Sequence, residues 1–304
     1  MTKVPKTFPF TPILGWSSTR YDLFRICRRR YYYEYYRKYD REVPLKDIEE
    51  KRELTTAPLE TGAVVHQVIA VLLGRLRRTA EEIDRAKFFD FARRAVLHST
   101  QSKEFEEVHY GLVPRVPLED IYPKVAASLE NLLDSPRLQW LTGTAARFSD
   151  EWLIDPPGYG ETRIGDLKAY CKVDFLFPVE GVHHILEWKT GKKDPEKHRK
   201  QLLGYAAWAS FHLEVEPELV SPAIVYLQPA YEEVQETFNT YDVSQFEGQV
   251  RAETHEMYSY CESISENIPL DKAAFPLVND DRICTFCNYR GLCFPERFPK
   301  ASGA

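Results

Sequence analysis

Residues 172–189 decide the fold, and they read KVDFLFPVEGVHHILEWK. Two runs of aliphatic, β-branched and aromatic residues flank Glu180-Gly181, and a two-residue loop between such runs predicts a β-hairpin. Counting outward from a loop of that length places Asp174 directly opposite Glu187. The two acidic side chains therefore lie on one face of the predicted sheet.

Lys189 joins the two acids because it lies two residues after Glu187 on the same strand face, whereas Leu186 and Trp188 point to the other face, into a core. Facing residues have Cβ atoms about 4.5 to 5.5 Å apart, so the two carboxylates repel unless a cation or a proton lies between them. A Mg²⁺ or Mn²⁺ ion, which prefers hard oxygen ligands, would relieve this repulsion. Such a site suits phosphodiester hydrolysis, in which the ion activates water and the ammonium group stabilises negative charge. Taken alone, the three side chains also fit an exposed Lys/Glu ladder on a strand.

Two predicted helices, at residues 58–78 and 195–212, flank the hairpin in the sequence. Each carries a pair of residues four apart, and therefore on one helix face: Gly62 and His66 on the first, Gln201 and Tyr205 on the second. A single histidine on so apolar a helix is more often a hydrogen-bonded core group than a metal ligand. The histidine becomes a candidate ligand only as part of a larger pattern.

That pattern, in chain order, is Gly62-xxx-His66, Val173-Asp174, Glu187-Trp188-Lys189-Thr190-Gly191 and Gln201-xxx-Tyr205. It resembles the motifs of RecB-like nucleases in the PD-(D/E)XK superfamily, over about residues 17–295. The resemblance implies that His66, Asp174, Glu187 and the main-chain carbonyl of Trp188 hold the metal ion, and that Lys189 is the catalytic lysine. Gln201 and Tyr205 would complete the catalytic set by positioning DNA or the site. Val173 stands where the superfamily usually has proline, which leaves the metal-binding acid in place.

Cys284, Cys287 and Cys293 follow a C-x2-C-x5-C pattern that indicates a metal or redox site. Such sites ordinarily take four ligands, and Cys27 is the best candidate for the fourth. A group held in this way would join segments more than 250 residues apart. The arrangement resembles the iron-sulfur staple of AddB and of the four-cysteine CRISPR-associated exonucleases, which implies a [4Fe-4S] cluster, with structural zinc as the alternative. The remaining cysteines are left out of the cluster: Cys171 on the core face of its strand, and Cys261 in a predicted helix.

The segment 20–41 combines eight Arg or Lys residues with three acids and seven tyrosines, and it is predicted to be helical. Either its tyrosines cover a core, or it forms a phosphate-binding and base-stacking surface. The second interpretation makes five basic residues candidates for nucleic-acid binding: Arg28, Arg29, Arg30, Lys192 and Lys193. A polar linker is expected from Asp40 to Thr56.

Composition and charge limit the class of protein. The chain has 304 residues, of which 43% are hydrophobic and 28% charged, as in globular proteins and unlike disordered or fibrous chains. Its net charge of -6 restricts any nucleic-acid contact to local basic patches. Prolines interrupt the first 18 residues, so no secretory signal is visible, and the apolar stretch 63–73 is far shorter than the roughly 20 residues that span a bilayer. We expect a soluble, cytoplasmic protein with no membrane partner.

The predicted fold is α/β, with a restriction-endonuclease-like mixed sheet flanked by helices, a helical insertion and a cysteine-ligated clasp that joins the termini. Its parts are an N-terminal Arg/Tyr-rich segment (1–56), a nuclease core (57–78 and 146–243), a helical insertion (79–145), and a C-terminal helix with the clasp (244–304). The predicted function is that of a Mg²⁺- or Mn²⁺-dependent exonuclease acting on single-stranded DNA or DNA ends in repair, recombination or defence. The alternatives are a non-catalytic DNA-binding or structural subunit of such a complex, and a zinc-stabilised structural protein. The sequence has no Walker A motif, so a helicase or a CRISPR or defence partner would be a separate subunit.

Overall fold

The computed structural model describes residues 6–155 and 161–301, and the chain divides into two compact units. The first, called here the sheet unit, comprises Met1–Phe10, Pro58–Gln101 and Pro117–Gln249. The second, called the clasp unit, comprises Thr11–Ala57, Ser102–Val116 and Val250–Ala304. Each unit is therefore assembled from segments that are far apart in the sequence. The four predicted parts of the chain divide the sequence differently and stay a prediction.

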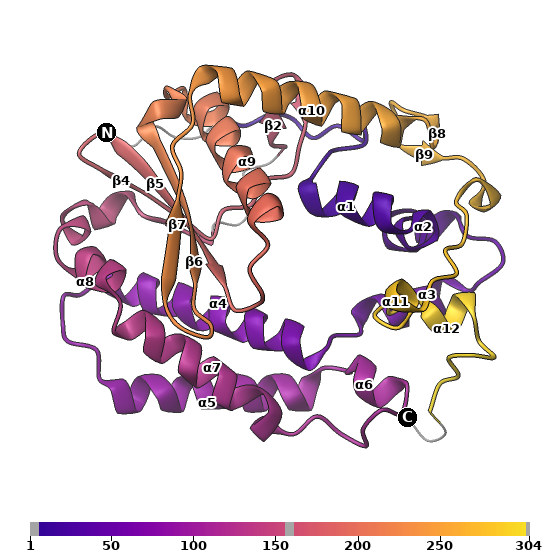
Figure 1. Ribbon diagram of the computed structural model, residues 1–304, viewed down its shortest axis with the longest axis horizontal. Coiled ribbons are helices and arrows are strands. Elements are labelled where there is room, and N and C mark those ends of the chain that lie inside the picture. The colour runs from indigo at the N-terminus through magenta and orange to yellow at the C-terminus, as the bar shows by residue number, and fades with distance from the viewer. Residues whose placement is uncertain (1–5, 156–160, 302–304) are drawn as a thin grey trace. The chain divides into compact units, whose positions relative to one another are not determined.

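A five-stranded mixed sheet forms the centre of the sheet unit, in the order β1-β4-β5-β6-β7 (Figure 1). Strands β5 and β6 run parallel, and the other neighbours run antiparallel. Helix α9 connects β5 to β6 and packs against β6, whose residues are all buried, as expected of a strand covered on both faces. The strands are β1 (Leu153–Ile154), β4 (Phe175–Val179), β5 (Val182–Lys189), β6 (Val220–Tyr226) and β7 (Glu232–Gln235). This architecture confirms the predicted mixed α/β fold.

The β4–β5 hairpin has the register that the sequence predicts. Val179 pairs with Val182, and the ladder continues to Phe175 and Leu186. The loop residues Glu180 and Gly181 have φ angles of 51° and 86°, the left-handed conformation that a tight hairpin turn of the favoured twist requires. Glycine adopts this conformation without a steric penalty. The turn thus fixes which face each side chain of β5 occupies.

Helices precede and follow the strands of this sheet in the sequence, and local residues determine where some of them begin. Helix α9 begins at Pro195, and the side chain of Asp194 accepts a hydrogen bond from the backbone N–H of Lys197, as an N-cap does. The other elements are α4 (Ala57–Leu76), α5 (Arg85–Ser102), α7 (Leu118–Leu133), α8 (Pro136–Thr142), η2 (Ala145–Glu151), β2 (Arg163–Ile164), β3 (Leu167–Lys168), α9 (Pro195–Leu213), η3 (Pro217–Leu219) and α10 (Thr240–Tyr258).

Helix α4 is the one described helix that is long and apolar enough to cross a membrane, a test that core helices of soluble proteins also pass. Its residues Val64, Val65, Val68 and Ile69 are buried, and His66 on the same helix bonds to the sheet. These contacts are those of a core helix. A cytoplasmic location stays a prediction.

The clasp unit is mainly helical and has an aromatic core. Four of its tyrosines are almost fully buried: Tyr31, Tyr32, Tyr33 and Tyr36. The rings of Tyr31, Tyr32 and Tyr36 contact Phe275, and that of Tyr33 contacts Tyr32 and Tyr289. This packing decides for the core interpretation of residues 20–41, because buried rings cannot stack on bases. The elements are α1 (Ser18–Ile26), α2 (Arg28–Tyr36), η1 (Arg37–Tyr39), α3 (Leu45–Glu53), α6 (Glu106–His109), β8 (Cys261–Ser263), β9 (Ile268–Pro269), η4 (Lys272–Ala274), α11 (Asp281–Cys284) and α12 (Arg290–Cys293).

Two local expectations are wrong in the clasp unit. The expected polar linker from Asp40 to Thr56 contains helix α3, which buries Ile48 and Lys51 and is followed by the buried Leu54. Cys261, which the sequence places in a helix, lies in strand β8, because helix α10 ends at Tyr258.

Candidate active site

His66 and Asp174 form one half of the candidate site in the sheet unit. His66 Nδ1 lies 3.2 Å from Asp174 Oδ2, and its Nε2 lies 2.8 Å from the main-chain oxygen of Trp188. Asp174 Oδ2 also accepts a hydrogen bond of 3.1 Å from the Trp188 backbone N–H. The helix lies close to the end of β5 at Gly62, where an added Cβ would lie 3.4 Å from Thr190 Oγ1, at van der Waals contact.

Charge coupling between these two groups outweighs their burial. Burial alone would lower the pKa of His66, but the hydrogen bond and the charge of Asp174 raise it overall. Burial alone would raise the pKa of Asp174, but the hydrogen bond and the charge of His66 lower it overall. The pair therefore favours an imidazolium next to a carboxylate.

Glu187, Lys189 and Tyr205 form the other half of the site. Lys189 Nζ donates to Glu187 Oε1 over 2.6 Å, and the Tyr205 hydroxyl donates to Glu187 Oε2. Gln201 Nε2 in turn donates to the Tyr205 hydroxyl over 2.7 Å. Glu187 is only 6% exposed, and burial, followed by the nearby charge of Asp174, raises its pKa. The lysine and the tyrosine thus compensate a carboxylate that the fold has removed from water.

A cavity of about 580 Å³ opens on the first half of the site. Its walls include His66, Asp174 and Trp188, together with Lys172 and Arg77. Asp174 retains 19% of its side-chain exposure, so its carboxylate can be reached from this space. A substrate entering the cavity would meet the acidic and histidine side chains directly.

The donor set suits a hard or borderline divalent ion, because it offers an imidazole, two carboxylates and a main-chain carbonyl. Without a metal ion, the predicted ligands are engaged with other groups: His66 with Asp174 and Trp188, and Glu187 with Lys189 and Tyr205. In the described residues, however, His66, Asp174 and Glu187 do not bring three ligand atoms within 4.8 Å of one another, so Glu187 would have to shift to share an ion with the other two. Their role as metal ligands stays a prediction.

A family model for the PD-(D/E)XK nuclease superfamily matches residues 15–294. The chain belongs to the PD-(D/E)XK nuclease superfamily. Membership in this nuclease superfamily agrees with the observed fold and gives the acidic hairpin a hydrolytic context. Among solved structures, that of SSO0001 covers 67% of this chain and 95% of its own chain, at 14% sequence identity and a TM-score of 0.31. The comparison with curated proteins found no match.

Four cysteines of this superfamily member line one small cavity of about 20 Å³ in the clasp unit: Cys27, Cys284, Cys287 and Cys293. Burial, with the neighbouring sulfurs, raises the pKa of Cys287 to about 11 and that of Cys293 to about 12. Cys27 is the N-cap of helix α2, and its Sγ accepts a hydrogen bond from the backbone N–H of Arg30. The structure therefore brings together the four cysteines that the sequence singles out. The remaining two lie elsewhere, Cys171 beside Gly204 and Cys261 beside Tyr36.

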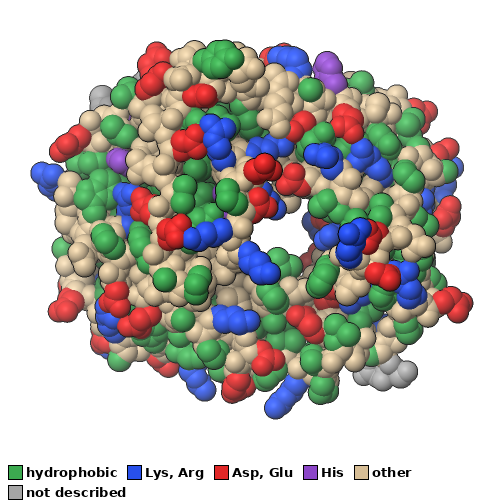
Figure 2. All heavy atoms as spheres, in the orientation of Figure 1, with side chains coloured by type: hydrophobic (Ala, Val, Ile, Leu, Met, Phe, Trp, Pro, Cys, Tyr) green, Lys and Arg blue, Asp and Glu red, His purple; other side chains and the backbone are tan. Residues whose placement is uncertain are grey.

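The five basic candidates for nucleic-acid binding are divided between the two units, and they differ in their hydrogen bonds, ion pairs and exposure. Arg28 bonds to Glu256 over 2.8 Å, and Arg29 donates to the main-chain oxygens of Phe275 and Lys272. Lys193 pairs with Glu232, and Lys192 is exposed, while Arg30 is half-buried. On the face drawn in Figure 2, Lys and Arg side chains lie among Asp and Glu side chains. Lys192 and Lys193 belong to the sheet unit and the three arginines to the clasp unit, and the role of all five in nucleic-acid binding stays a prediction.

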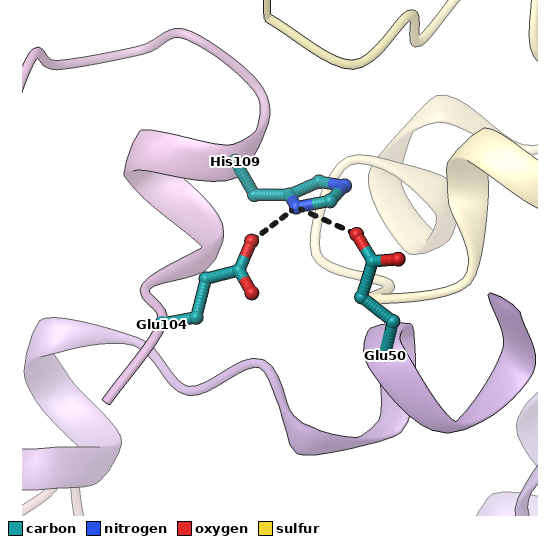
Figure 3. Close-up of side chains that lie close together, drawn as sticks. All are labelled: Glu50, Glu104 and His109. Carbon is teal, nitrogen blue, oxygen red and sulfur yellow. Dashed lines mark hydrogen bonds and ion pairs between the residues drawn. The ribbon is translucent and has the colours of Figure 1, made fainter. Parts of the chain in front are cut away.

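A histidine with two glutamates in the clasp unit has no counterpart in the predictions from sequence. His109 Nδ1 lies 2.8 Å from Glu104 Oε1 and 4.0 Å from Glu50 Oε1 (Figure 3). Among the residues that the structure describes, this is the one group with three such ligand atoms all within 4.8 Å of one another, so it could hold a metal ion. Glu50 also accepts hydrogen bonds from Lys51 and Lys300, and the Lys300 bond lowers its pKa to about 2. No spacing signal reveals the group, since Glu50 is over 50 residues from Glu104.

Proposed function

We propose that this chain is a RecB-like, metal-dependent deoxyribonuclease that hydrolyses phosphodiester bonds, acting as an exonuclease on single-stranded DNA or DNA ends. One observation supports the proposal: Lys189 binds one oxygen of the buried Glu187 carboxylate, close enough to the His66–Asp174 pair for the charge of Asp174 to act on Glu187. A fold that served only structure would gain stability by replacing a buried charged group with an apolar one.

Each residue has a proposed role. His66, Asp174, Glu187 and the main-chain carbonyl of Trp188 would hold Mg²⁺ or Mn²⁺. When bound, the ion would polarise a phosphate oxygen and lower the pKa of a water molecule. Metal binding requires a neutral imidazole nitrogen, so His66 must release the proton that Asp174 favours.

Lys189 would then exchange partners. In the described structure its ammonium group neutralises Glu187, and a cation at Glu187 would free it to stabilise negative charge developing on the phosphate. The Tyr205 hydroxyl, held by Gln201, would keep the Glu187 carboxylate in its orientation throughout. These two are positioning residues, because they act through Glu187.

The direct test is cleavage of end-labelled DNA by the purified protein with Mg²⁺ or Mn²⁺. Lys189→Met should lower the rate by a factor of about 100 or more, since removing one stabilising group from a polar active site commonly has that effect. Lys46→Ala, at an exposed position on α3, should leave the rate unchanged. Comparison of 5′-blocked, 3′-blocked and circular single strands separates exonuclease from endonuclease action. Absence of cleavage with either ion, or unchanged cleavage by Lys189→Met, would refute the proposal in favour of a non-catalytic DNA-binding subunit.

We also propose a [4Fe-4S] cluster on Cys27, Cys284, Cys287 and Cys293, in the manner of AddB. Four thiols around one cavity form a suitable donor set. Burial first, and then the neighbouring sulfurs, raise the pKa of Cys287 and Cys293, so a bound cation would be needed to hold these two as thiolates. A tetrahedral zinc site would hold the sulfurs about 3.8 Å apart, given Zn–S bonds of about 2.3 Å. Iron and acid-labile sulfide should be present in protein purified without oxygen and absent from Cys284→Ser. Zinc at one equivalent, with neither iron nor sulfide, would instead support the structural-zinc alternative.

The proposed pathway is repair, recombination or defence, with a helicase or a CRISPR or defence subunit as a separate cytoplasmic partner. Arg28, Arg29, Arg30, Lys192 and Lys193 stay candidates for contacts with DNA. Charge-removing substitutions there should reduce the salt dependence of DNA binding, which measures phosphate contacts. Unchanged salt dependence would exclude those residues from the interface.

A further inference from the structure

A second cavity adjoins the catalytic one within the sheet unit. It has a volume of about 630 Å³, and Arg77 at the end of helix α4 lines both cavities. Its other walls come from residues 78–85, from α8 and from the turn that precedes β1. Arg77 therefore marks the passage from the proposed catalytic centre into a further space of similar size.

One face of helix α4 lines the catalytic cavity and extends to Arg77. Ala63, Gln67, Ala70 and Gly74 line the catalytic cavity at helical spacing, and three of the four are small. A Cβ built on Gly74 has no atom within 4 Å, so open space lies above the helix there. From His66 to Arg77 the helix rises about 16 Å at 1.5 Å per residue. A chain of ligand groups could lie along this face.

Among the described residues, two of the arginines that line the second cavity form no ion pair. In the described part of the chain, neither Arg77 nor Arg78 forms an ion pair with an acid, and Arg77 donates to the main-chain oxygen of Trp152. Arg85, which also lines the second cavity, is neutralised by Glu130 and Asp134. Exposed Glu81 and Glu82 at the same cavity work against an anion, so the attraction must come from the two arginines.

The wall of the second cavity also contains a buried donor that lacks an acceptor. Trp152 is 1% exposed, and its indole Nε1 has no hydrogen-bond partner. Because this nitrogen has almost no accessible surface, a ligand in the cavity does not reach it, and the features that could bind a ligand there are the arginines and the open face of α4.

We propose that the face of α4 from His66 to Arg77 is the track of a single nucleic-acid strand. Arg77 and Arg78 bind its phosphates, and the second cavity receives a nucleotide beyond the scissile position. Each cavity has a volume that suits a ligand of nucleotide size. The proposal therefore takes a single strand as the substrate class. At about 3.4 Å per stacked nucleotide the track holds up to about five. The proposal rests on the nuclease function and deepens it.

Binding of fluorescein-labelled oligo(dT) without catalysis tests this track. The background is Lys189→Met protein in EDTA, so no cleavage interferes. Arg77→Gln/Arg78→Gln should weaken binding and reduce the slope of log affinity against log salt by about 1.4, at about 0.7 per phosphate contact on a single strand. The matched control is Arg93→Gln/Arg94→Gln, an exposed adjacent pair on α5 with the same loss of charge.

A second pair of variants tests the track without changing charge. Gly74→Leu places a side chain in the open space above α4, whereas Gly74→Ala adds only a Cβ. Both substitutions favour helix, so the fold should persist and circular dichroism should confirm it. We expect Gly74→Leu to weaken oligonucleotide binding at least tenfold and Gly74→Ala to leave it within twofold.

The outcomes separate the track from the nuclease function. If wild-type protein cleaves DNA but neither pair of variants differs from its control in binding, the track is refuted and the function stands. If binding depends on Arg77, Arg78 and Gly74 as expected but no cleavage occurs with Mg²⁺ or Mn²⁺, the function is refuted and the track stands. Equal affinity for duplex and single strands, or no binding at all, would also refute the track.

Discussion

Replacing Tyr205 with phenylalanine should reveal how strongly the fold holds the Glu187 carboxylate. The substitution deletes one buried hydroxyl that donates to Glu187 Oε2 and accepts from Gln201. Hydrogen bonds to charged groups contribute about 1.5 to 3 kcal/mol, and neutral ones about 0.5 to 1.5 kcal/mol. Tyr205→Phe should therefore lower the free energy of unfolding by about 2 to 3 kcal/mol. In Glu187→Gln protein the same bond becomes neutral, so the coupling energy between the two substitutions should be about 1 to 2 kcal/mol.

Urea unfolding of the four proteins of this cycle, in EDTA at pH 8, measures the coupling. Tryptophan fluorescence is a suitable probe because Trp140, Trp152, Trp188 and Trp208 lie in the sheet unit, against one tryptophan in the clasp unit. Tyr241→Phe, at a 70% exposed position on α10, is the control and should change stability by less than about 0.5 kcal/mol. A coupling energy below about 0.5 kcal/mol would show that the hydroxyl does not bind a charged carboxylate, and the reasoning for the site would be refuted.

Three further predictions concern stability alone. Burial lowers the pKa of His184 to about 4, so between about pH 6.5 and 4 the unfolded chain binds a proton that the folded chain does not bind. The free energy of unfolding should therefore decrease by up to about 3 kcal/mol as the pH falls through this range. His184→Phe should flatten that pH dependence in urea titrations. Gly181→Ala, at a φ of 86°, should cost about 1 kcal/mol, whereas Gly191→Ala, where the added Cβ meets nothing, should be nearly neutral in thermal unfolding. Arg290→Met leaves Glu106 largely buried without its partner and should destabilise the clasp unit by about 3 to 5 kcal/mol in urea; a loss below 1 kcal/mol would contradict the burial of this pair.

The hairpin could be predicted from the sequence because its turn determines its register. A loop of two residues with Glu180-Gly181 leaves one pairing that keeps the apolar side chains of both strands in the core, and that pairing also decides the position of Lys189. Local chemistry likewise predicted the start of α9, since Asp194 and Pro195 need no distant partner to begin a helix. These features depend on neighbours in the sequence.

Features that depend on tertiary packing could not be predicted in the same way. The contact between Tyr205 and Glu187 requires α9 to present one particular face to the sheet, which spacing along the helix does not determine. From the sequence alone, the tyrosines of α2 fit both a core and a binding surface. Only the structure shows that they are buried, with Phe275 packed against Tyr32. The group of Glu50, Glu104 and His109 comes from segments with no common motif.

The clasp unit has a consequence for how the protein is made. Its segments Thr11–Ala57 and Ser102–Val116 leave the ribosome long before Val250–Ala304, which must complete the unit. Because domains generally fold as their chain emerges, the early segments have to wait through the synthesis of more than 130 residues with their aromatic side chains unburied. We expect a nascent chain that stops before residue 250 to engage chaperones through these tyrosines, and the emergence of Val250–Ala304 to end this exposure.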